Sequence, residues 1–134
     1  MFFVKQPWRF EIVVISNLFG DIITDLGAAI AGGLGLAAGA NINPTREVPS
    51  MFEPIHGSAP DIAGKGIAKS LATIWSASQI LDFFGHDDWG KEVLNSIEKV
   101  MLEGEVLTPD MGGQSSTQEV GQAVAGKLNI FLKK

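Results

Sequence analysis

Two aspartates, Asp21 and Asp25, lie four positions apart in the otherwise uncharged stretch NLFGDIITD. On a helix this spacing places both side chains on one face, about 5–6 Å apart at Cβ, where two like charges are mildly destabilising. Either both carboxylates face solvent near the start of a helix, whose partial positive charge favours them, or they share a cation. The spacing alone favours the solvated pair, because so short a pattern specifies little. A shared cation would be Mg²⁺ or Mn²⁺, which prefer oxygen ligands.

The stretch HGSAPDIAGKGIA, residues 56–68, is rich in glycine and alanine. Small side chains leave backbone amides accessible, and accessible amides can hold an anion such as a phosphate. The stretch lacks the G-x-G-x-x-G spacing of a Rossmann dinucleotide site. Taken alone, it fits a structural Ω-like loop, with His56 bonded to backbone, better than it fits a ligand site.

The elements that would position these residues are predicted from the spacing of apolar side chains. Residues 10–16, FEIVVIS, contain four consecutive β-branched apolar residues and predict a strand covered on both faces. A helix is predicted to begin near Gly20 or Asp21, because apolar residues then recur at helical spacing. Short strands are predicted near residues 40 and 52, on either side of a polar loop.

Further helices are predicted in the rest of the chain. One begins at Leu71, the next begins at about Asp88, and the last follows Ser116 and Glu119, which have the spacing of a capping box. The side chains expected to face the core are Leu71, Ile74, Trp75, Leu81, Val93, Ile97, Val100, Met101, Val120, Ala123, Val124, Leu128 and Phe131. We therefore predict an α/β fold, with helices packed on a few strands, and a single domain over residues 1–134.

Composition excludes several classes of function. A net charge of −5 argues against general affinity for nucleic acid or an anionic membrane surface. The chain has no cysteine, which excludes disulfides and thiolate metal sites and makes the cytoplasm the expected compartment. Its first residues lack the apolar core of a secretory signal, and no apolar run is long enough to span a bilayer.

Three motifs together resemble one enzyme family. NLFGDIITD, then FEPIHGSAPDIAGKGIA, then TPDMGG with STQE close behind it, are similar in order and spacing to the metal-dependent β-decarboxylating dehydrogenases. That family includes the isocitrate, 3-isopropylmalate, homoisocitrate and tartrate/D-malate dehydrogenases. The stretches SNLFGDI and ANINPTREVPSMFEP look most like the tartrate/D-malate branch, with the isopropylmalate branch second.

The resemblance implies a metal site and a cofactor site. It makes Asp21 and Asp25 ligands of Mg²⁺ or Mn²⁺, and it makes the glycine-rich stretch an adenosine-binding loop for NAD. In that loop Asp61 would accept hydrogen bonds from the ribose hydroxyls and would repel a 2′-phosphate, which favours NAD over NADP. The residues implied for the cofactor are His56, Gly57, Ser58, Ala59, Asp61, Ile62 and Lys69. The implied reaction is the oxidation and decarboxylation of a small 2-hydroxy acid.

The resemblance also implies that much of the enzyme is missing. Members of the family are well over twice as long, and this chain looks like their C-terminal portion, with residues 1–16 belonging to the last part of the missing domain. No catalytic residue is therefore predicted here, since the family's acid and base residues lie upstream. A homodimer or a complementing N-terminal half is the expected partner. The alternatives are a non-catalytic fragment that binds nucleotide or metal or oligomerises, and one chain of a split enzyme.

Other polar residues receive a weaker interpretation. Lys69 and Ser70 stand where the family usually has asparagine and proline, which puts the contact to adenine in doubt. The trio His86, Asp87 and Asp88 is interpreted as a turn and the start of a helix, because these residue types favour caps and turns. Asp110, with the glycines that follow it, resembles the family's late loop, which lies near the cofactor site.

Overall fold

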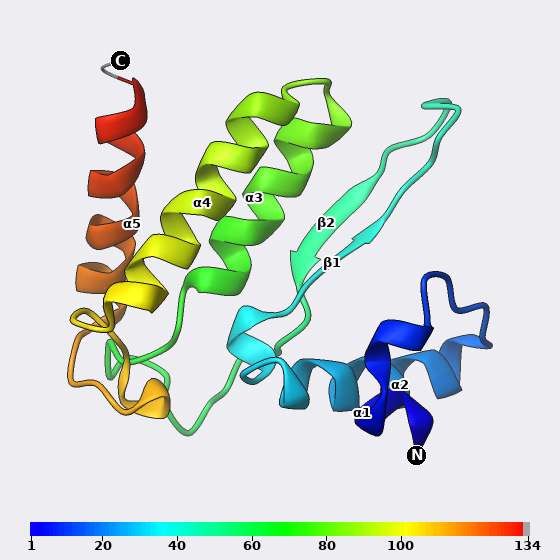
Figure 1. Ribbon diagram of the computed structural model, residues 1–134, viewed down its shortest axis with the longest axis horizontal. Helices are drawn as coiled ribbons and strands as arrows, with labels where there is room; N and C mark the ends of the chain where they lie inside the picture. Colours follow the sequence, from blue (N-terminus) through cyan, green and yellow to red (C-terminus); the bar gives the residue numbers. More distant parts are fainter. Residues whose placement is uncertain (133–134) are drawn as a thin grey trace.

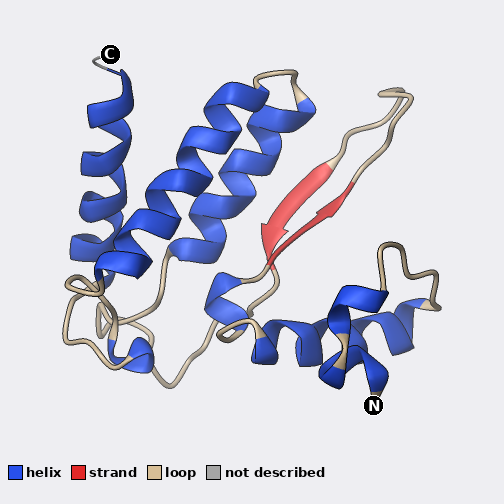
Figure 2. Cartoon of the chain, viewed as in Figure 1, coloured by secondary structure: helices blue, strands red, loops and turns tan. Residues whose placement is uncertain are grey.

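The computed structural model describes the backbone of residues 1–132 and the side chains of residues 1–128. Figure 1 shows the arrangement: three long helices lie side by side, a hairpin lies along one of them, and an N-terminal pair of helices lies below the hairpin. Figure 2 shows that helix predominates and that the described strands form only the hairpin. The predicted α/β composition, with helices against a small sheet, is confirmed.

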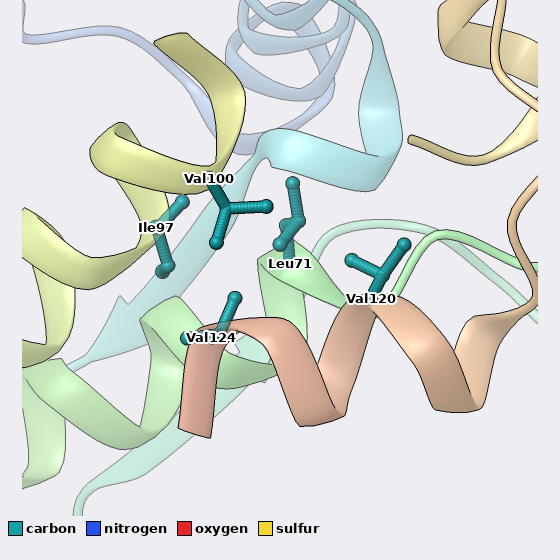
Figure 3. Packing of buried hydrophobic residues seen from close by; sticks show 5 residues of the cluster. All are labelled: Leu71, Ile97, Val100, Val120 and Val124. Atoms are coloured by element: carbon teal, nitrogen blue, oxygen red, sulfur yellow. The ribbon is translucent and has the colours of Figure 1, made fainter. Parts of the chain in front are cut away.

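The three long helices form the core of the molecule. They are α3 (Leu71–Phe83), α4 (Asp87–Glu103) and α5 (Thr117–Leu132). The buried cluster between them is Leu71, Ile97, Val100, Val120 and Val124, which Figure 3 shows converging from all three helices. These positions repeat at helical spacing in the sequence, so their burial follows the predicted pattern. Trp75 departs from it, because it is partly exposed, and the side chain of Phe131 lies outside those described.

The start of α5 confirms the predicted capping box. The backbone amide and the hydroxyl of Ser116 donate to the Glu119 carboxylate, at 2.7 and 2.8 Å. In return the Glu119 amide donates to the Ser116 hydroxyl at 3.2 Å. These bonds satisfy amides that a helix start leaves without partners. The adjacent Thr117 donates to the carbonyls of Gly66 and Ala68, at 2.8 and 2.6 Å, and so ties the glycine-rich stretch to α5.

The described sheet is the antiparallel hairpin of β1 (Ala38–Asn41) and β2 (Met51–Pro54), as predicted near residues 40 and 52. Its register pairs Ala38 with Pro54 and Asn41 with Met51. The loop between the strands is tied to the end of α3 by Arg46, whose guanidinium donates to the Phe83 carbonyl at 2.6 Å. The same guanidinium lies 4.7 Å from the centroid of the Phe83 ring.

The N-terminal part contains a short helix α1 (Phe2–Lys5) and a longer helix α2 (Asn17–Ile30), joined by the 3₁₀ turn η1 (Pro7–Arg9) and a segment without regular secondary structure. The predicted strand at residues 10–16 is wrong. Ile12 is 87% exposed and Val14 is 96% exposed, and no described strand pairs with this segment. A doubly covered strand needs neighbouring strands, and the described residues supply none here.

Helix α2 begins at Asn17, earlier than the predicted start near Gly20 or Asp21. Asp21 and Asp25 therefore lie beyond the first turn, where the partial positive charge of the helix end has largely decayed. Most apolar side chains of the N-terminal part are exposed, as expected if they contact a partner: Phe2, Val4, Trp8, Phe10, Ile12, Val13, Val14, Ile15, Leu18, Phe19, Ile22, Leu26 and Ile30. None of the described helices combines the length and the apolar character needed to cross a bilayer.

Candidate functional site

The two aspartates of α2 face a hollow of about 680 Å³, here called the carboxylate hollow. Its walls come from α2, from β1, and from β2 with the segment that follows it. Its lining residues are Asp21, Thr24, Asp25, Gly39, Ala40, Asn41, Glu53, Pro54, Ile55, His56 and Gly57. The structure thus brings the predicted metal ligands and the first residues of the predicted adenosine loop to one place.

The carboxylate hollow follows from two local features. In α2, residues 21, 24 and 25 share one face, because they are spaced three and four apart. The hydroxyl of Thr24 is turned to the helix backbone and donates to the carbonyls of Gly20 and Asp21, at 3.0 and 3.1 Å, so the two carboxylates are the charged groups of this face. On the other wall, the Ile55 amide donates to the Ala37 carbonyl at 3.1 Å, which extends the pairing of the hairpin to the residue before His56.

The carboxylate hollow supplies some, but not all, of the ligands that a divalent cation needs. Asp21 and Asp25 are exposed and supply carboxylate oxygens, which fit Mg²⁺ or Mn²⁺. Among the described residues, no group of three or more His, Cys, Asp or Glu side chains could hold a metal ion. Octahedral coordination would therefore need further ligands from water, from a bound substrate or from another polypeptide.

A second hollow, of about 380 Å³, lies against the glycine-rich stretch and is here called the loop hollow. Three chain segments line it: the turn after α2, the loop 56–69 and the 3₁₀ turn η3 (Pro109–Met111). The lining residues are Leu34, Gly35, His56, Gly57, Ala59, Ile62, Ile67, Ala68, Lys69, Pro109 and Asp110. Most of these are apolar or small, which suits a flat apolar ring with a few polar edges.

His56 lies between the two hollows and lines both. Its Nδ1 lies 3.1 Å from the carbonyl oxygen of Gly57. A carbonyl oxygen only accepts, so Nδ1 carries a proton in this arrangement, and in the neutral ring Nε2 is then the acceptor. That Nε2 is buried and has no hydrogen-bond partner among the described residues. A buried polar atom without a partner is rare and is satisfied when a ligand or a water binds next to it.

Five of the residues predicted for the cofactor line the loop hollow: His56, Gly57, Ala59, Ile62 and Lys69. Ser58 and Asp61 belong to the same loop, but both are exposed and neither lines this hollow. Ala59 adopts a φ of 43°, in the left-handed region that a non-glycine residue rarely occupies. The turn that follows is closed by the Ile62 amide, which donates to the Ala59 carbonyl at 3.0 Å.

The charged wall of the loop hollow consists of Lys69 and Asp110. The Lys69 side chain is 4% exposed, and its Nζ lies 2.9 Å from Oδ2 of Asp110. The same Nζ donates to the Gly32 carbonyl at 3.2 Å, and the buried Thr108 hydroxyl donates to Oδ1 of Asp110 at 2.5 Å. Burial raises the pKa of the Asp110 carboxyl, but hydrogen bonds from Thr108 and Lys69 and the Lys69 charge outweigh it and hold the pKa below its ordinary value.

Sequence reasoning missed part of this lining. Leu34 and Gly35 lie in the run GLGLAAG, whose uniform composition gives no sign of a site. Pro109 was missed as well, although it belongs to the TPDMGG motif, whose resemblance to the family's late loop implies that Asp110 lies near the cofactor site. The trio at residues 86–88 begins α4, as predicted, with His86 as the residue before the helix. A further hollow of about 540 Å³, between the hairpin loop and the end of α3, contains none of the predicted site residues.

Comparison with known proteins now defines the family. The pattern of the family described as isocitrate/isopropylmalate dehydrogenase matches residues 1–124. The chain belongs to the isocitrate/isopropylmalate dehydrogenase family. The family resemblance seen in the three motifs is confirmed by a match that covers nearly all of the described residues.

Relatives in sequence include both expected branches. The chain is 54% identical to the tartrate dehydrogenase/decarboxylase of Pseudomonas putida, with 94% of this chain and 36% of the relative covered. It is 51% identical to the decarboxylating D-malate dehydrogenase of Escherichia coli K12, with 91% and 35% covered. It is 52% identical to the 3-isopropylmalate dehydrogenase of Thermobifida fusca, with 96% and 35% covered. The chain thus spans about a third of the length of these curated relatives.

Solved structures agree with the fold. The isocitrate dehydrogenase of Methylococcus capsulatus has a TM-score of 0.87 and 40% identity, over 96% of this chain and 38% of that one. A β-decarboxylating dehydrogenase of Thermococcus kodakarensis has a TM-score of 0.86 and 39% identity, over 98% and 38%. The described residues therefore adopt the fold of part of an isocitrate/isopropylmalate dehydrogenase.

Proposed function

We propose that this chain is the part of an oxidative decarboxylating dehydrogenase that binds NAD and a divalent metal. The substrate class is a small 2-hydroxy acid of the tartrate/D-malate or 3-isopropylmalate type, in keeping with the printed names of the relatives. One observation carries the proposal: Asp21 and Asp25 line the same hollow as His56 and Gly57, and those two residues also line the loop hollow. A metal-bound acid and a nucleotide would then lie side by side.

Asp21 and Asp25 are the proposed ligands of Mg²⁺ or Mn²⁺. When bound, such an ion acts as a Lewis acid on the oxygen of the carbon being oxidised and offsets the negative charge that decarboxylation leaves on that oxygen. The role of the two aspartates is to fix the cation against the wall formed by residues 53–57. Both aspartates are exposed in the part of the chain that the structure describes, which leaves room for the 2-hydroxy acid to complete the coordination of the ion.

The loop hollow is the proposed adenosine site of NAD. Its apolar and small lining would pack against the adenine ring, and Nε2 of His56 offers a buried acceptor to an amino or hydroxyl group of the ligand. Asp61 is the proposed acceptor for the ribose hydroxyls, and Ser58 would contact the phosphate side. Asp61 is exposed next to the hollow, so it can reach a ribose that projects from the hollow toward solvent.

Catalysis by the isolated chain is not expected. We assign no acid or base residue within it, and we propose that those groups come from residues outside this sequence, such as those of a complementing N-terminal half. The exposed apolar side chains of the N-terminal part give such a partner a surface to cover. We expect no formation of NADH from D-malate by this chain alone, and steady turnover by it would overturn this assignment.

Binding of the metal tests the site without requiring activity. Free Mn²⁺ is measured by electron paramagnetic resonance while the chain is titrated, and NAD binding is measured by calorimetry with and without Mn²⁺. We expect D21N and D25N each to weaken Mn²⁺ binding by about tenfold or more, because each removes a charged ligand. The double variant D87N/D88N is the matched control, because it removes two carboxylates at the start of α4, away from the carboxylate hollow.

Two results would contradict the proposal: equal Mn²⁺ affinity in wild type and D21N/D25N, or no NAD binding at millimolar concentration. The second candidate function, a non-catalytic fragment that oligomerises, is favoured by the exposed apolar side chains of the N-terminal part. Sedimentation equilibrium distinguishes it, since stable self-association without NAD or Mn²⁺ binding is its signature. A split enzyme would instead reduce NAD only when a polypeptide corresponding to the N-terminal half is added.

A further inference from the structure

Lys69 connects all the walls of the loop hollow. It belongs to the loop 56–69, its ammonium donates to Gly32 in the turn after α2, and it forms an ion pair with Asp110 in η3. The hollow is lined by residues of these same segments. Among the hydrogen bonds and ion pairs of the described side chains that line the hollow, those of Lys69 alone reach both other walls.

The aliphatic stem of the Lys69 side chain is closely packed, and its ammonium group is paired. A Cβ placed on Gly35 would lie 2.9 Å from Cδ and 3.0 Å from Cβ of Lys69, so the stem lies directly on the backbone of the turn. The residue as a whole is buried, and an ammonium group is buried only when it is paired. Asp110 supplies that pair, and the Thr108 hydroxyl fixes the carboxylate from the other side.

We propose that Lys69 is a positioning residue for the nucleoside. By holding the turn after α2 and η3 at fixed distances from the loop 56–69, it keeps the loop hollow open at the width of an adenosine. The inference rests on the proposed adenosine site. It goes beyond that site because it assigns to one side chain the role of holding the walls of the site at the right distance. Thr117 ties the same loop to α5 through the carbonyls of Gly66 and Ala68, and Lys69 ties it to the other two walls.

Adenosine is the probe that tests this role, with its dissociation constant measured by calorimetry on the whole chain. K69M keeps an unbranched apolar stem over Gly35 but removes the bonds to Gly32 and Asp110. We expect K69M to weaken adenosine binding by about fivefold or more, the size that one net hydrogen bond contributes. K69R keeps the charge and the donors, and we expect it to recover at least half of that loss on a logarithmic scale.

The matched control is K127M, because Lys127 also forms an ion pair, with Glu103 at 2.6 Å, between α4 and α5 and outside the loop hollow. We expect K127M to bind adenosine as the wild type does, even if its melting temperature falls as far as that of K69M. D110N should weaken binding in the same direction as K69M. The double variant K69M/D110N should bind no more weakly than K69M, because both changes act through one bond.

The outcomes separate this inference from the proposed function. If the wild-type chain binds no adenosine, the proposed function fails and the inference fails with it. If the wild type binds adenosine and folded K69M binds it equally well, only the inference is overturned. A loss in K127M as large as that in K69M would also overturn it, because general destabilisation would then explain the effect. If K69M does not fold, D110N decides: weaker adenosine binding than in the wild type supports the inference, and equal binding overturns it.

Discussion

Lys69 and Asp110 meet as an ion pair at the wall of the loop hollow, with 2.9 Å between Nζ and Oδ2. The lysine side chain is almost wholly buried, whereas the aspartate side chain is about half exposed, so the pair joins the interior of the protein to its surface. The ion pair depends on pH through the Asp110 carboxyl, whose pKa is held below its ordinary value.

The first prediction concerns acid stability. Protonation of Asp110 removes the ion pair, and the ordinary pKa from which the folded-state value is lowered is 3.8. A carboxyl with a lowered pKa contributes its stability fully above the unfolded-state pKa and loses it as pH falls through the folded-state pKa. We therefore expect the free energy of unfolding to be insensitive to Asp110 above about pH 5 and to fall at lower pH. Because Asp110 is partly exposed, the contribution should be no more than about 1 kcal/mol.

Urea unfolding between pH 7 and pH 2.5 measures this effect. D110N should lose less stability on acidification than the wild type, since it has no carboxyl to protonate. D61N serves as the control, because no hydrogen bond or ion pair of the described residues involves the Asp61 side chain, and it should lose as much stability on acidification as the wild type. Equal acid sensitivity in D110N and the wild type would contradict the prediction.

The second prediction concerns the start of α5. Replacing Ser116 by alanine removes the hydroxyl that accepts from the Glu119 amide and donates to its carboxylate. We expect S116A to lower the free energy of unfolding by about 1 kcal/mol, the usual effect of losing such a cap. S115A is the control, because no described hydrogen bond involves the Ser115 hydroxyl. A loss in S115A equal to that in S116A would argue against the capping box.

The third prediction concerns Gly35, on which the Lys69 stem lies. An alanine Cβ there would lie 2.9 Å from Lys69 Cδ, and the stem cannot yield freely because its ammonium is bonded to Gly32 and Asp110. We expect G35A to destabilise the chain by about 1–3 kcal/mol, as overpacking does. In G126A the new methyl group meets open space on α5, so that control should be neutral or stabilising by up to about 1 kcal/mol. Thermal unfolding followed by circular dichroism compares the two variants, and a neutral G35A would contradict the fitted stem.

The fourth prediction concerns the helical core. Leu71 is 1% exposed and packs against Val100 and Val120, so L71A should cost about 2–5 kcal/mol through lost contacts and a residual cavity. Leu102, on the outer face of α4, is 87% exposed, and L102A should change stability by no more than about 0.5 kcal/mol. Chemical denaturation gives both values, and similar losses in the two variants would show that α3, α4 and α5 do not form the common core.

Local patterns in the sequence determined much of this protein. The apolar spacing of Ile97, Val100, Val120 and Val124 predicted the faces that meet in the core, because a helix repeats every 3.6 residues wherever it packs. The capping box at Ser116 could also be predicted from the sequence, because its bonds join residues only three positions apart. The three motifs likewise contained enough specific residues to show the family.

Tertiary structure decided what depends on distant residues. Ile12 to Ile15 have the composition of a buried strand, yet this segment forms none, because strand formation requires a neighbouring strand that the described residues do not provide. The pairing of Lys69 with Gly32 and Asp110 joins residues far apart in the chain, and no local spacing encodes such a contact. The carboxylate hollow and the loop hollow are likewise products of packing, which brings the face of α2 and the end of the hairpin to one hollow, and the turn after α2 and η3 to the other, with His56 lining both.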